Sequence, residues 1–310
     1  TPMNPTLEIA GVERKLQGSL PDLLVDEALK WLRGQRRDQP QTPFLLAVHF
    51  REPHAPYAPV PPEDSAPFQS RSLTLPDVAG LEGDKVRRLR REYYGSVHAF
   101  DRNIGRILDA LDELEISERT IVIYTSDHGY MIGEHGLHHK GNASWLLPGK
   151  SGPRPNMFDD AIRVPLLARW PGVIAAGSRI DRVVSNLDLM PTVLELIGLG
   201  IPPNLRLEGR SFAPLLRGAS IPWDDTVFGQ YDMHHYAIAR MRMIRTPEWK
   251  LIRHFEPGVA DELYHLEVDP RELADLGAST DAADRAEFAR LNQRLADWMR
   301  SINDPLAVRQ

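Results

Sequence analysis

Cysteine is absent from the 310 residues of this chain. Disulfide bonds, thiolate metal sites and a cysteine nucleophile are therefore excluded within it, while the redox compartment stays open. A strong charge of one sign is lacking as well. The net charge is −6 at pH 7, so no strong field favours nucleic acid or an anionic membrane as a partner.

Long hydrophobic runs are also missing. The longest apolar stretches, such as residues 44–48 and 121–124, have the length of a strand, whereas a membrane helix needs about 20 apolar residues. The first residues show neither the basic start nor the apolar run of a signal peptide. Because the chain begins with Thr1 rather than Met, we expect that an upstream segment is missing from it.

What is present is the composition of an ordinary globular protein, with 42% hydrophobic and 26% charged residues. Ser19, followed three residues later by Asp22, predicts the start of a helix, which apolar residues continue at helical spacing. A sustained apolar stripe between Val86 and Leu111 predicts a second, long helix. Asp188 is predicted to cap a third helix, which runs through Ile197.

Short continuous apolar runs predict buried strands at residues 44–48 and 120–125, and a further strand is predicted at residues 164–170. Within the first of them, His49 is expected to be buried and hydrogen-bonded. The stretch from Pro53 to about Pro76 is rich in proline and is predicted to be a loop without regular structure. Strands that alternate with helices predict an α/β fold with a mostly parallel sheet flanked by helices.

The pattern changes beyond Trp223. Residues 227–231, 236–244 and 249–255 read as short strands, with a turn at 246–248, and a last helix is expected to pack over them. We therefore predict two domains: an α/β domain over residues 1–222, and a smaller antiparallel C-terminal subdomain with a terminal helix over residues 223–310.

The segment with the clearest chemistry is residues 125–141, TSDHGYMIGEHGLHHKG. Asp127 follows the end of a predicted strand and can offer an oxygen to a hard cation, while Gly129 permits a tight turn. Spacing alone leaves the alternative open that Asp127 caps a turn and His128 is a surface histidine, because two ligands do not make a metal site.

This segment resembles the sulfatase family within the alkaline phosphatase superfamily. The resemblance continues in order along nearly the whole chain from about Asp22. It covers PHAPY at 53–57, YYG at 93–95, SDHG at 126–129, GEHG at 133–136, KG at 140–141, RVPL at 163–166, RWPG at 169–172, DLMPT at 188–192, EGRSF at 208–212, RTPEWK at 245–250, ELYHL at 262–266 and DP at 269–270.

The resemblance implies roles for individual residues. Asp127 and His128 would bind one Ca²⁺, whose remaining ligands in the family are paired aspartates near the N-terminus, the nucleophile and the substrate. Lys140 would contact the sulfate group, since an ammonium neutralises charge on transferring oxygens. His54, between Pro53 and Pro56, would protonate the leaving alcohol.

Other polar residues of the loop after the metal motif are weaker candidates. His139, Asn142 and Arg154 would line a substrate pocket, although each is equally a candidate for a solvent-facing residue. The same alternatives hold for His135, His138 and Trp145. A second basic group is interpreted as a solvated strand face, with anion binding as the alternative; it comprises Arg240, Arg242, Arg245, Lys250 and Arg253.

The nucleophile that the resemblance implies is not found. Sulfatases use a formylglycine made from a Cys or Ser in a Cys/Ser-x-Pro-x-Arg motif. The nearest string, Ser151-Gly152-Pro153-Arg154, places its arginine one position too early and lies on the wrong side of the metal motif. We expect the nucleophile upstream of this chain, made by a formylglycine-generating enzyme, and we expect the chain alone to be inactive.

The sequence thus predicts a sulfuric ester hydrolase that acts on a sulfated carbohydrate or an aryl sulfate, with periplasmic or extracellular location implied by the family. Two alternatives stay open. One is a phosphomonoester or phosphonate hydrolase of the same superfamily, and the other is a protein that binds sulfated glycans without cleaving them.

Overall fold

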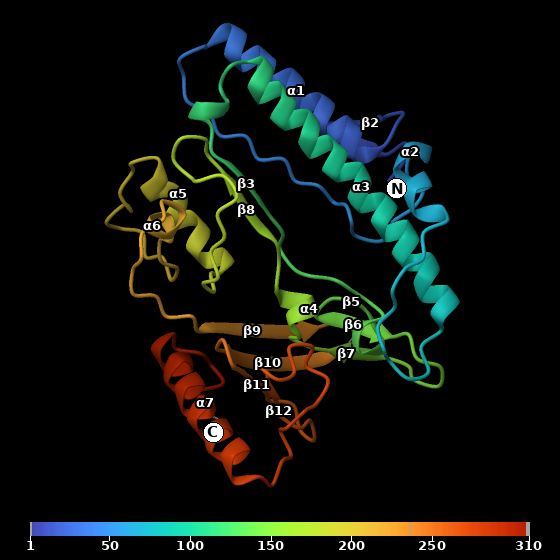
Figure 1. Ribbon diagram of the computed structural model, residues 1–310, viewed down its shortest axis with the longest axis vertical. Coiled ribbons are helices and arrows are strands. Elements are labelled where there is room, and N and C mark those ends of the chain that lie inside the picture. The colour runs from blue at the N-terminus through green and yellow to red at the C-terminus, as the bar shows by residue number, and fades with distance from the viewer. Residues whose placement is uncertain (1, 236, 308–310) are drawn as a thin grey trace. The chain divides into compact units, whose positions relative to one another are not determined.

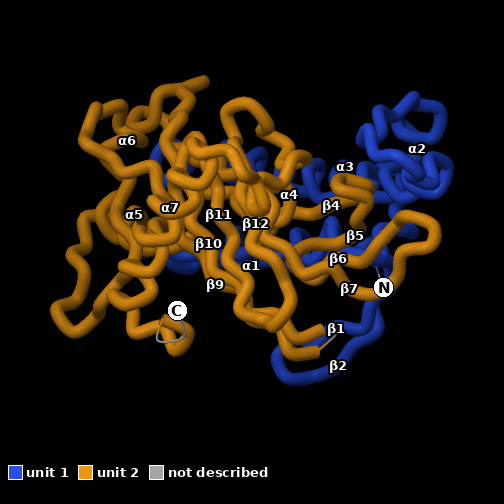
Figure 2. The backbone as a smooth tube through the Cα atoms, turned by 90° about the horizontal axis from the view of Figure 1, so that it is seen from below, with its two compact units in different colours: residues 1–122 blue, residues 123–310 orange. Residues whose placement is uncertain are grey.

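The computed structural model describes residues 2–235 and 237–307. Its contacts divide the chain into two compact units, residues 1–122 and 123–310 (Figure 2). The predicted boundary between residues 222 and 223 concerns the C-terminal sheet and stays a prediction. Among the described helices, none combines the length and the apolar character needed to cross a membrane.

Two long helices form the frame of the first unit. Helix α1 (Leu20–Asp38) and helix α3 (Gly83–Glu113) lie side by side (Figure 1). Ser19 caps α1 as predicted, because its Oγ accepts a hydrogen bond of 3.4 Å from the Asp22 amide. The helices bury apolar side chains against each other, including Val25, Leu29, Leu32, Ala110 and Leu111.

A hairpin that the sequence analysis did not predict precedes α1. Strands β1 (Thr6–Ile9) and β2 (Val12–Lys15) pair antiparallel, with Ala10 and Gly11 at φ 52° and 80° in the turn. Two central residues with positive φ are typical of a hairpin whose turn follows the twist of its strands.

The predicted strand at residues 44–48 is not formed. The segment is extended, but no strand pairs with it among the described residues. Phe44 and Leu46 pack against the helices, whereas Leu45 between them is 88% exposed. His49, expected to be buried, is exposed for the same reason: one side of the segment is covered by helices and the other is open.

The predicted loop at 53–76 contains a helix, α2 (Pro62–Gln69), which corrects the expectation that the prolines exclude regular structure. Pro62 lies in the first turn, where a missing N–H costs nothing. Pro67 lacks the donor that would continue the helix. Contacts with α3 therefore stabilise this helix, as its buried Asp64 illustrates below.

The second unit begins with the two other predicted strands. Strand β3 (Val122–Thr125) follows the short turn η1 (Ser117–Arg119) and pairs with β8 (Leu166–Arg169). Both strands are half-buried along most of their length, so β3 is less buried than predicted.

The helix predicted to begin at Asp188 is α5 (Leu189–Leu196), preceded by the turn η3 (Asn186–Asp188). Ser185 caps the turn η3, because its Oγ accepts from the Leu187 amide at 3.3 Å. Asp188 holds the N-cap position of α5 as predicted, but its side chain makes no capping hydrogen bond there. Its carboxylate instead accepts from the amides of Ser185 and Arg210, both at 2.8 Å. A short helix, α6 (Ala213–Leu216), packs against α5.

Between β3 and β8 the chain forms a small antiparallel sheet that was not predicted. Its order is β4 (Met131–Ile132), β5 (Leu137–His139), β6 (Asn142–Trp145) and β7 (Pro153–Pro155). The turn η2 (Glu134–Gly136) joins β4 to β5. Helix α4 (Asp159–Ile162) follows β7.

The C-terminal antiparallel sheet is confirmed. Its order is β12 (Glu262–His265), β11 (Trp249–His254), β10 (Ile238–Arg245) and β9 (Val227–His234); residue 236, included in the prediction, lies outside the described residues. One face packs on α7 (Ala282–Ser301), as predicted (Figure 1). The other face packs on residues from β4, β5 and the start of α4, including Met131, Leu137 and Phe158.

The basic residues of this sheet do not form a solvated face. Arg242 and Lys250 are 1% and 0% exposed. Arg242 pairs with Asp232 and Asp304, and Lys250 pairs with Asp159 and Glu272. Burial of a charge requires an opposite charge nearby, so these side chains serve internal ion pairs.

Candidate functional site

The turn that follows β3 presents the two predicted calcium ligands. Asn186 Nδ2 donates to the Ser126 carbonyl at 3.0 Å, and Ser126 Oγ donates to the His128 carbonyl at 3.0 Å. The Asp127 side chain is 80% exposed, and that of His128 is 29% exposed. The turn is thus fixed through its backbone, while its acidic side chain stays open to a ligand.

The two side chains face each other. Asp127 Oδ2 lies 3.3 Å from His128 Nε2, and Asp127 Oδ1 accepts from the His128 amide at 3.0 Å. His128 Nδ1 lies 2.9 Å from the Gly129 carbonyl, which can only accept, so the hydrogen bond assigns the proton to Nδ1. In the neutral imidazole Nε2 then carries a lone pair beside the carboxylate, a suitable arrangement for a cation.

This pair supplies only part of a calcium site. Ca²⁺ takes about six to eight ligands, mostly oxygen. No group of three or more His, Asp or Glu side chains able to hold a metal occurs in residues 2–235 and 237–307. The Asp127 carboxylate and the His128 imidazole fit one side of a calcium coordination shell. The ligands on the other side would be groups other than these two side chains.

Gly129 is required for a reason other than a special backbone angle. A Cβ at this position would lie 2.3 Å from the Asp160 carbonyl oxygen. The Gly129 amide donates to the Ala161 carbonyl at 2.9 Å. The turn therefore packs directly on the backbone of α4, and only glycine permits this approach.

Lys140 lies between β5 and β6 in the same unit. Burial lowers the pKa of its ammonium group below the usual value, and the negative charge of Asp127 opposes that shift. Lys140 is thus within electrostatic reach of the predicted calcium ligands. Its carbonyl accepts from the Ala143 amide and from Asn156 Nδ2, both at 2.9 Å, which fixes its backbone.

Two predicted substrate residues flank Lys140. His139 has φ 85°, a left-handed conformation unusual for a side chain of this size, and its Nδ1 lies 2.7 Å from the Tyr130 hydroxyl. Asn142 begins β6, and its Oδ1 is buried without a hydrogen-bond partner in the described part of the chain. An orphaned buried acceptor is unusual and suits a ligand donor.

The third predicted substrate residue, Arg154, is engaged in the protein. Its Nη2 lies 3.0 Å from Glu262 Oε1, and its Nη1 donates to the Pro155 carbonyl at 2.6 Å. Glu262 also accepts from His254 and Tyr264. Nη2 therefore binds the C-terminal sheet and Nη1 binds the backbone of β7, and a role in substrate binding stays a prediction.

His54 lies in the first unit, in the loop between the extended segment and α2. Its Nδ1 lies 2.7 Å from the Ala55 carbonyl, and its amide donates to the Arg51 carbonyl at 3.0 Å. The peptide bonds before Pro53, Pro56 and Pro59 are cis. Tyr57 is buried edge-on against Tyr93 of α3, with ring centroids 5.5 Å apart.

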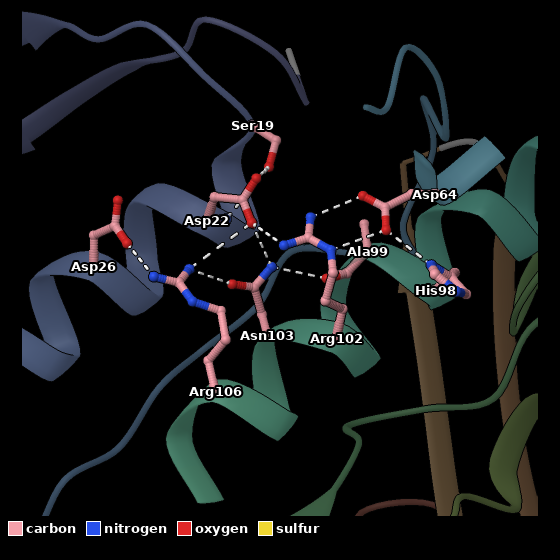
Figure 3. A network of polar contacts seen from close by, with 9 residues as sticks. All are labelled: Ser19, Asp22, Asp26, Asp64, His98, Ala99, Arg102, Asn103 and Arg106. Carbon is pink, nitrogen blue, oxygen red and sulfur yellow. Dashed lines mark hydrogen bonds and ion pairs between the residues drawn. The ribbon is translucent and has the colours of Figure 1, made fainter. Parts of the chain in front are cut away.

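A polar network holds the far end of this loop (Figure 3). Asp64 of α2 is fully buried and accepts from Arg102 Nη2 at 2.9 Å and from His98 Nδ1 at 2.8 Å. Arg102 also donates to Asp22 at the start of α1. Burial alone would raise the pKa of Asp64, but the hydrogen bonds from Arg102 and His98 lower it.

The second unit thus brings Asp127, His128 and Lys140 together, with His139 and Asn142 beside Lys140 in the chain. Convergence of His54 on the same site stays a prediction, because His54 belongs to the other unit. The sequence analysis missed Tyr130 and Asn156, which support His139 and Lys140. Neither carries a signal in the sequence, since their contacts depend on the unpredicted small sheet.

The chain is similar to known proteins along most of its length. Residues 3–199 match the profile of the family described as Sulfatase, and residues 154–301 match that described as N-sulphoglucosamine sulphohydrolase, C-terminal. An N-acetylglucosamine-6-O-sulfatase of Bacteroides thetaiotaomicron is 30% identical over 232 residues, covering 71% of this chain and 38% of the relative. An arylsulfatase of Clostridium perfringens is 29% identical over 293 residues, covering 86% and 55%. The chain therefore spans about half the length of these relatives, or less.

Solved structures share the fold. A protein in complex with its substrate D-glucosamine-2-N,6-O-disulfate superposes with a TM-score of 0.82 at 22% identity, covering 98% of this chain and 74% of that one. A phosphonate monoester hydrolase of Agrobacterium radiobacter superposes with a TM-score of 0.73 at 25% identity, covering 90% and 60%. The predicted α/β fold of the alkaline-phosphatase type, with an antiparallel C-terminal subdomain, is confirmed.

Proposed function

The chain belongs to the sulfatase family, and from this premise we propose that it serves in the hydrolysis of a sulfate ester, on a sulfated carbohydrate or an aryl sulfate. One observation carries the proposal: Asp127, His128 and the half-buried Lys140 are grouped beyond the end of β3 within electrostatic reach of one another. A carboxylate, an imidazole and an ammonium in this arrangement suit a site for a cation and an anionic group.

Lys140 is assigned to the sulfate oxygens. Its ammonium is a compact cation with three donors, able to neutralise charge that develops on the transferring group. Partial burial strengthens this attraction, because water screens it less. His139 and Asn142 are assigned to substrate binding on the strength of their position beside Lys140, and Arg154 is retained as a weaker candidate.

Asp127 Oδ2 and His128 Nε2 would hold one Ca²⁺. A bound calcium ion would supply positive charge that neutralises the anionic group during hydrolysis. The remaining ligands are proposed to come from residues outside this grouping, in keeping with the family resemblance.

His54 is assigned to protonation of the leaving alcohol. Its Nδ1–H donates to the Ala55 carbonyl at 2.7 Å, an acceptor that also suits the protonated imidazole. The second ring nitrogen is then the one that delivers a proton to the departing oxygen. The loop between Phe50 and α2 keeps this imidazole in place.

The nucleophile is proposed to lie outside these 310 residues, which contain no cysteine and no serine in the required motif. No strand pairs with residues 44–48 in the described part of the chain, and Leu45 is exposed, which supports this proposal because a further strand would satisfy the backbone groups of this segment. A formylglycine-generating enzyme would then be needed by the whole protein, which we place in the periplasm or outside the cell.

A second function has a specific observation in its favour. The likeness to a phosphonate monoester hydrolase at 25% identity keeps phosphonate or phosphate monoesters as alternative substrates. Binding of a sulfated glycan without cleavage is the remaining alternative.

The experiment is a comparison of kcat/KM for paired esters with one leaving group, 4-nitrophenyl sulfate against 4-nitrophenyl phenylphosphonate and 4-nitrophenyl phosphate. The whole encoded protein is expressed with a formylglycine-generating enzyme. We expect the sulfate to be preferred and the preference to fall in Lys140→Ala. Preference for the phosphonate would establish the second function, and binding of a sulfated glycan without release of sulfate would establish the third.

A further inference from the structure

We propose that Asp159, held by Lys250 and Arg245 of the C-terminal sheet, is a positioning residue for the Asp127–His128 turn. The inference deepens the proposed function, because it assigns to the C-terminal sheet a part in building the cation site. It concerns only residues of the second unit.

The first link is a buried ion cluster on the face of the sheet opposite α7. Lys250 is fully buried, and its Nζ lies 2.5 Å from Asp159 Oδ1 and 2.5 Å from Glu272 Oε1. Arg245 Nη2 lies 3.0 Å from Asp159 Oδ2. Burial would raise the pKa of Asp159, but the charges and hydrogen bonds of Lys250 and Arg245 lower it, so the carboxylate is ionised.

The second link joins this cluster to α4. Asp159 begins that helix, and its amide donates to Glu272 Oε2 at 2.6 Å. Lys250 Nζ also donates to the Met157 carbonyl at 3.2 Å. Lys250 and Arg245 of the sheet therefore bind the Asp159 side chain, and Lys250 also binds the backbone just before α4. These contacts fix the position of the helix along the sheet and its distance from it.

The third link joins α4 to the turn. The Ala161 carbonyl accepts from the Gly129 amide at 2.9 Å, and the Asp160 carbonyl fills the space that a Cβ of Gly129 would occupy. His135 stacks on Phe158 with ring centroids 3.8 Å apart. Since Gly129 directly follows His128, a shift of α4 moves the backbone that orients the ligand pair.

A matched pair of arginines tests the inference. Arg245 and Arg253 both lie on the C-terminal sheet, are 19% and 20% exposed, and each pairs with one aspartate, Asp159 and Asp261 respectively. Only Arg245 contacts α4. We compare Arg245→Gln with Arg253→Gln in the whole protein, and include Arg245→Lys, which keeps a charge next to Asp159.

Two readouts are taken. The first is hydrogen exchange at the Gly129 amide, referred in the same sample to amides at the C-terminal end of α7, away from Asn292, which accepts from Arg253. This reference separates local loosening from loss of global stability. The second is the affinity for CaCl₂ by calorimetry. In Arg245→Gln we expect Gly129 exchange to quicken and calcium affinity to fall, each by about tenfold, the size seen when partners of ligands are removed. Arg253→Gln should match the wild type in both, and Arg245→Lys should recover part of the loss.

The inference would be overturned if hydrogen exchange at the Gly129 amide quickened equally in both glutamine variants, or did not quicken in Arg245→Gln. Gly129→Ala provides a test that leaves the ion cluster untouched: its methyl group must push the turn away from α4, so wild-type calcium affinity in this variant would also overturn it. If the wild type itself binds no calcium, the proposed cofactor fails, and the exchange readout alone decides the inference.

Discussion

Lys140 and Lys150 show how differently two lysines of one small sheet are situated. Lys140 is half-buried within reach of the Asp127 charge, whereas Lys150 is exposed with its Nζ 4.1 Å from the centroid of the Trp145 ring. In the proposed role, Lys140 contributes an ammonium donor to the transferring group, and alanine removes it. We expect Lys140→Ala to lower kcat for sulfate hydrolysis by about a hundred- to a thousandfold.

Lys150→Ala serves as the matched control and should keep kcat within about twofold, because water screens the charge of an exposed lysine from the charge on the transferring group. Steady-state kinetics on an aryl sulfate by the whole protein check both values. Equal losses in the two variants would show that general surface charge, not the Lys140 position, supports the reaction.

His54 can be tested through the leaving group. A poor, alkoxide-like leaving group needs a proton as it departs, and an activated aryl oxide does not. His54→Ala should therefore slow an alkyl or sugar sulfate by about a hundredfold or more, while it slows 4-nitrophenyl sulfate far less. Rates on both esters, measured with one enzyme preparation, check this. Losses of the same size on both esters would remove His54 from the role of acid.

Some residue roles could be predicted from the sequence and others could not. Ser19 as a cap depends on residues three positions away, and it was found. Asp188 was predicted to cap α5, yet it accepts from the Arg210 amide, 22 positions further on. Lys250 gave no sign in the sequence of its full burial, because its partners Asp159 and Glu272 are distant in the chain.

At the scale of elements, α2 depends on one buried carboxylate. Asp64 accepts from both Arg102 and His98 and has no exposed surface (Figure 3). Asp64→Ala removes the hydrogen bonds of Arg102 and His98 to a buried carboxylate, while Arg102 keeps Asp22, so we expect a loss of about 2–3 kcal/mol in the free energy of unfolding. Urea denaturation at pH 7 measures it.

Asp26→Ala is the control, because Asp26 of α1 also pairs with an arginine of α3, Arg106, but is 56% exposed. An exposed pair is worth about 1 kcal/mol or less. If the two variants lost equal stability, the buried network would not be what holds α2 on α3.

The C-terminal sheet should carry a pH-dependent stability through Glu262. Burial alone would raise the pKa of Glu262, but hydrogen bonds from His254 and Tyr264 and the charge of Arg154 lower it to about 2. A lowered pKa stabilises the fold above the ordinary value of 4.5 and loses that contribution as pH falls toward 2. At pH 7 the contribution is about 3 kcal/mol.

Glu262→Gln, an isosteric change without the charge, should therefore lower the free energy of unfolding by about 3 kcal/mol at pH 7. The difference from the wild type should shrink by more than half by about pH 3, as the wild-type carboxylate loses its advantage. Denaturation curves across this range check the trend. A difference that does not change between pH 7 and pH 3 would assign the effect to packing instead.

Elements whose apolar repeat continues over many residues were predicted well. Elements that form only through contacts with distant parts of the chain were not. Helices α1, α3 and α7 repeat apolar residues over several turns, and strands β9 to β11 were predicted from short apolar runs around a turn, whereas β12 was not predicted. The run at 44–48 has the composition of a buried strand, but no ladder forms on it among the described residues. Strands β4 to β7 are two to four residues long, too short for any periodicity to show.

At the scale of the whole molecule, the order of the family motifs predicted the fold, because motifs at strand ends fix which strands and helices follow one another. It did not predict which residues belong to each of the two compact units. The chain divides after Val122, within β3, so that Asp127 and Lys140 belong to one unit and His54 to the other.

The most direct test of this account is sulfate release under multiple turnover by the purified 310-residue chain, beside the longer encoded protein matured with a formylglycine-generating enzyme. The account predicts release from the longer protein, its loss in Lys140→Ala, and no release from the 310-residue chain, which has no residue to become the nucleophile. Turnover by the 310-residue chain that disappears in Lys140→Ala could not come from a contaminating enzyme, and it would contradict the account.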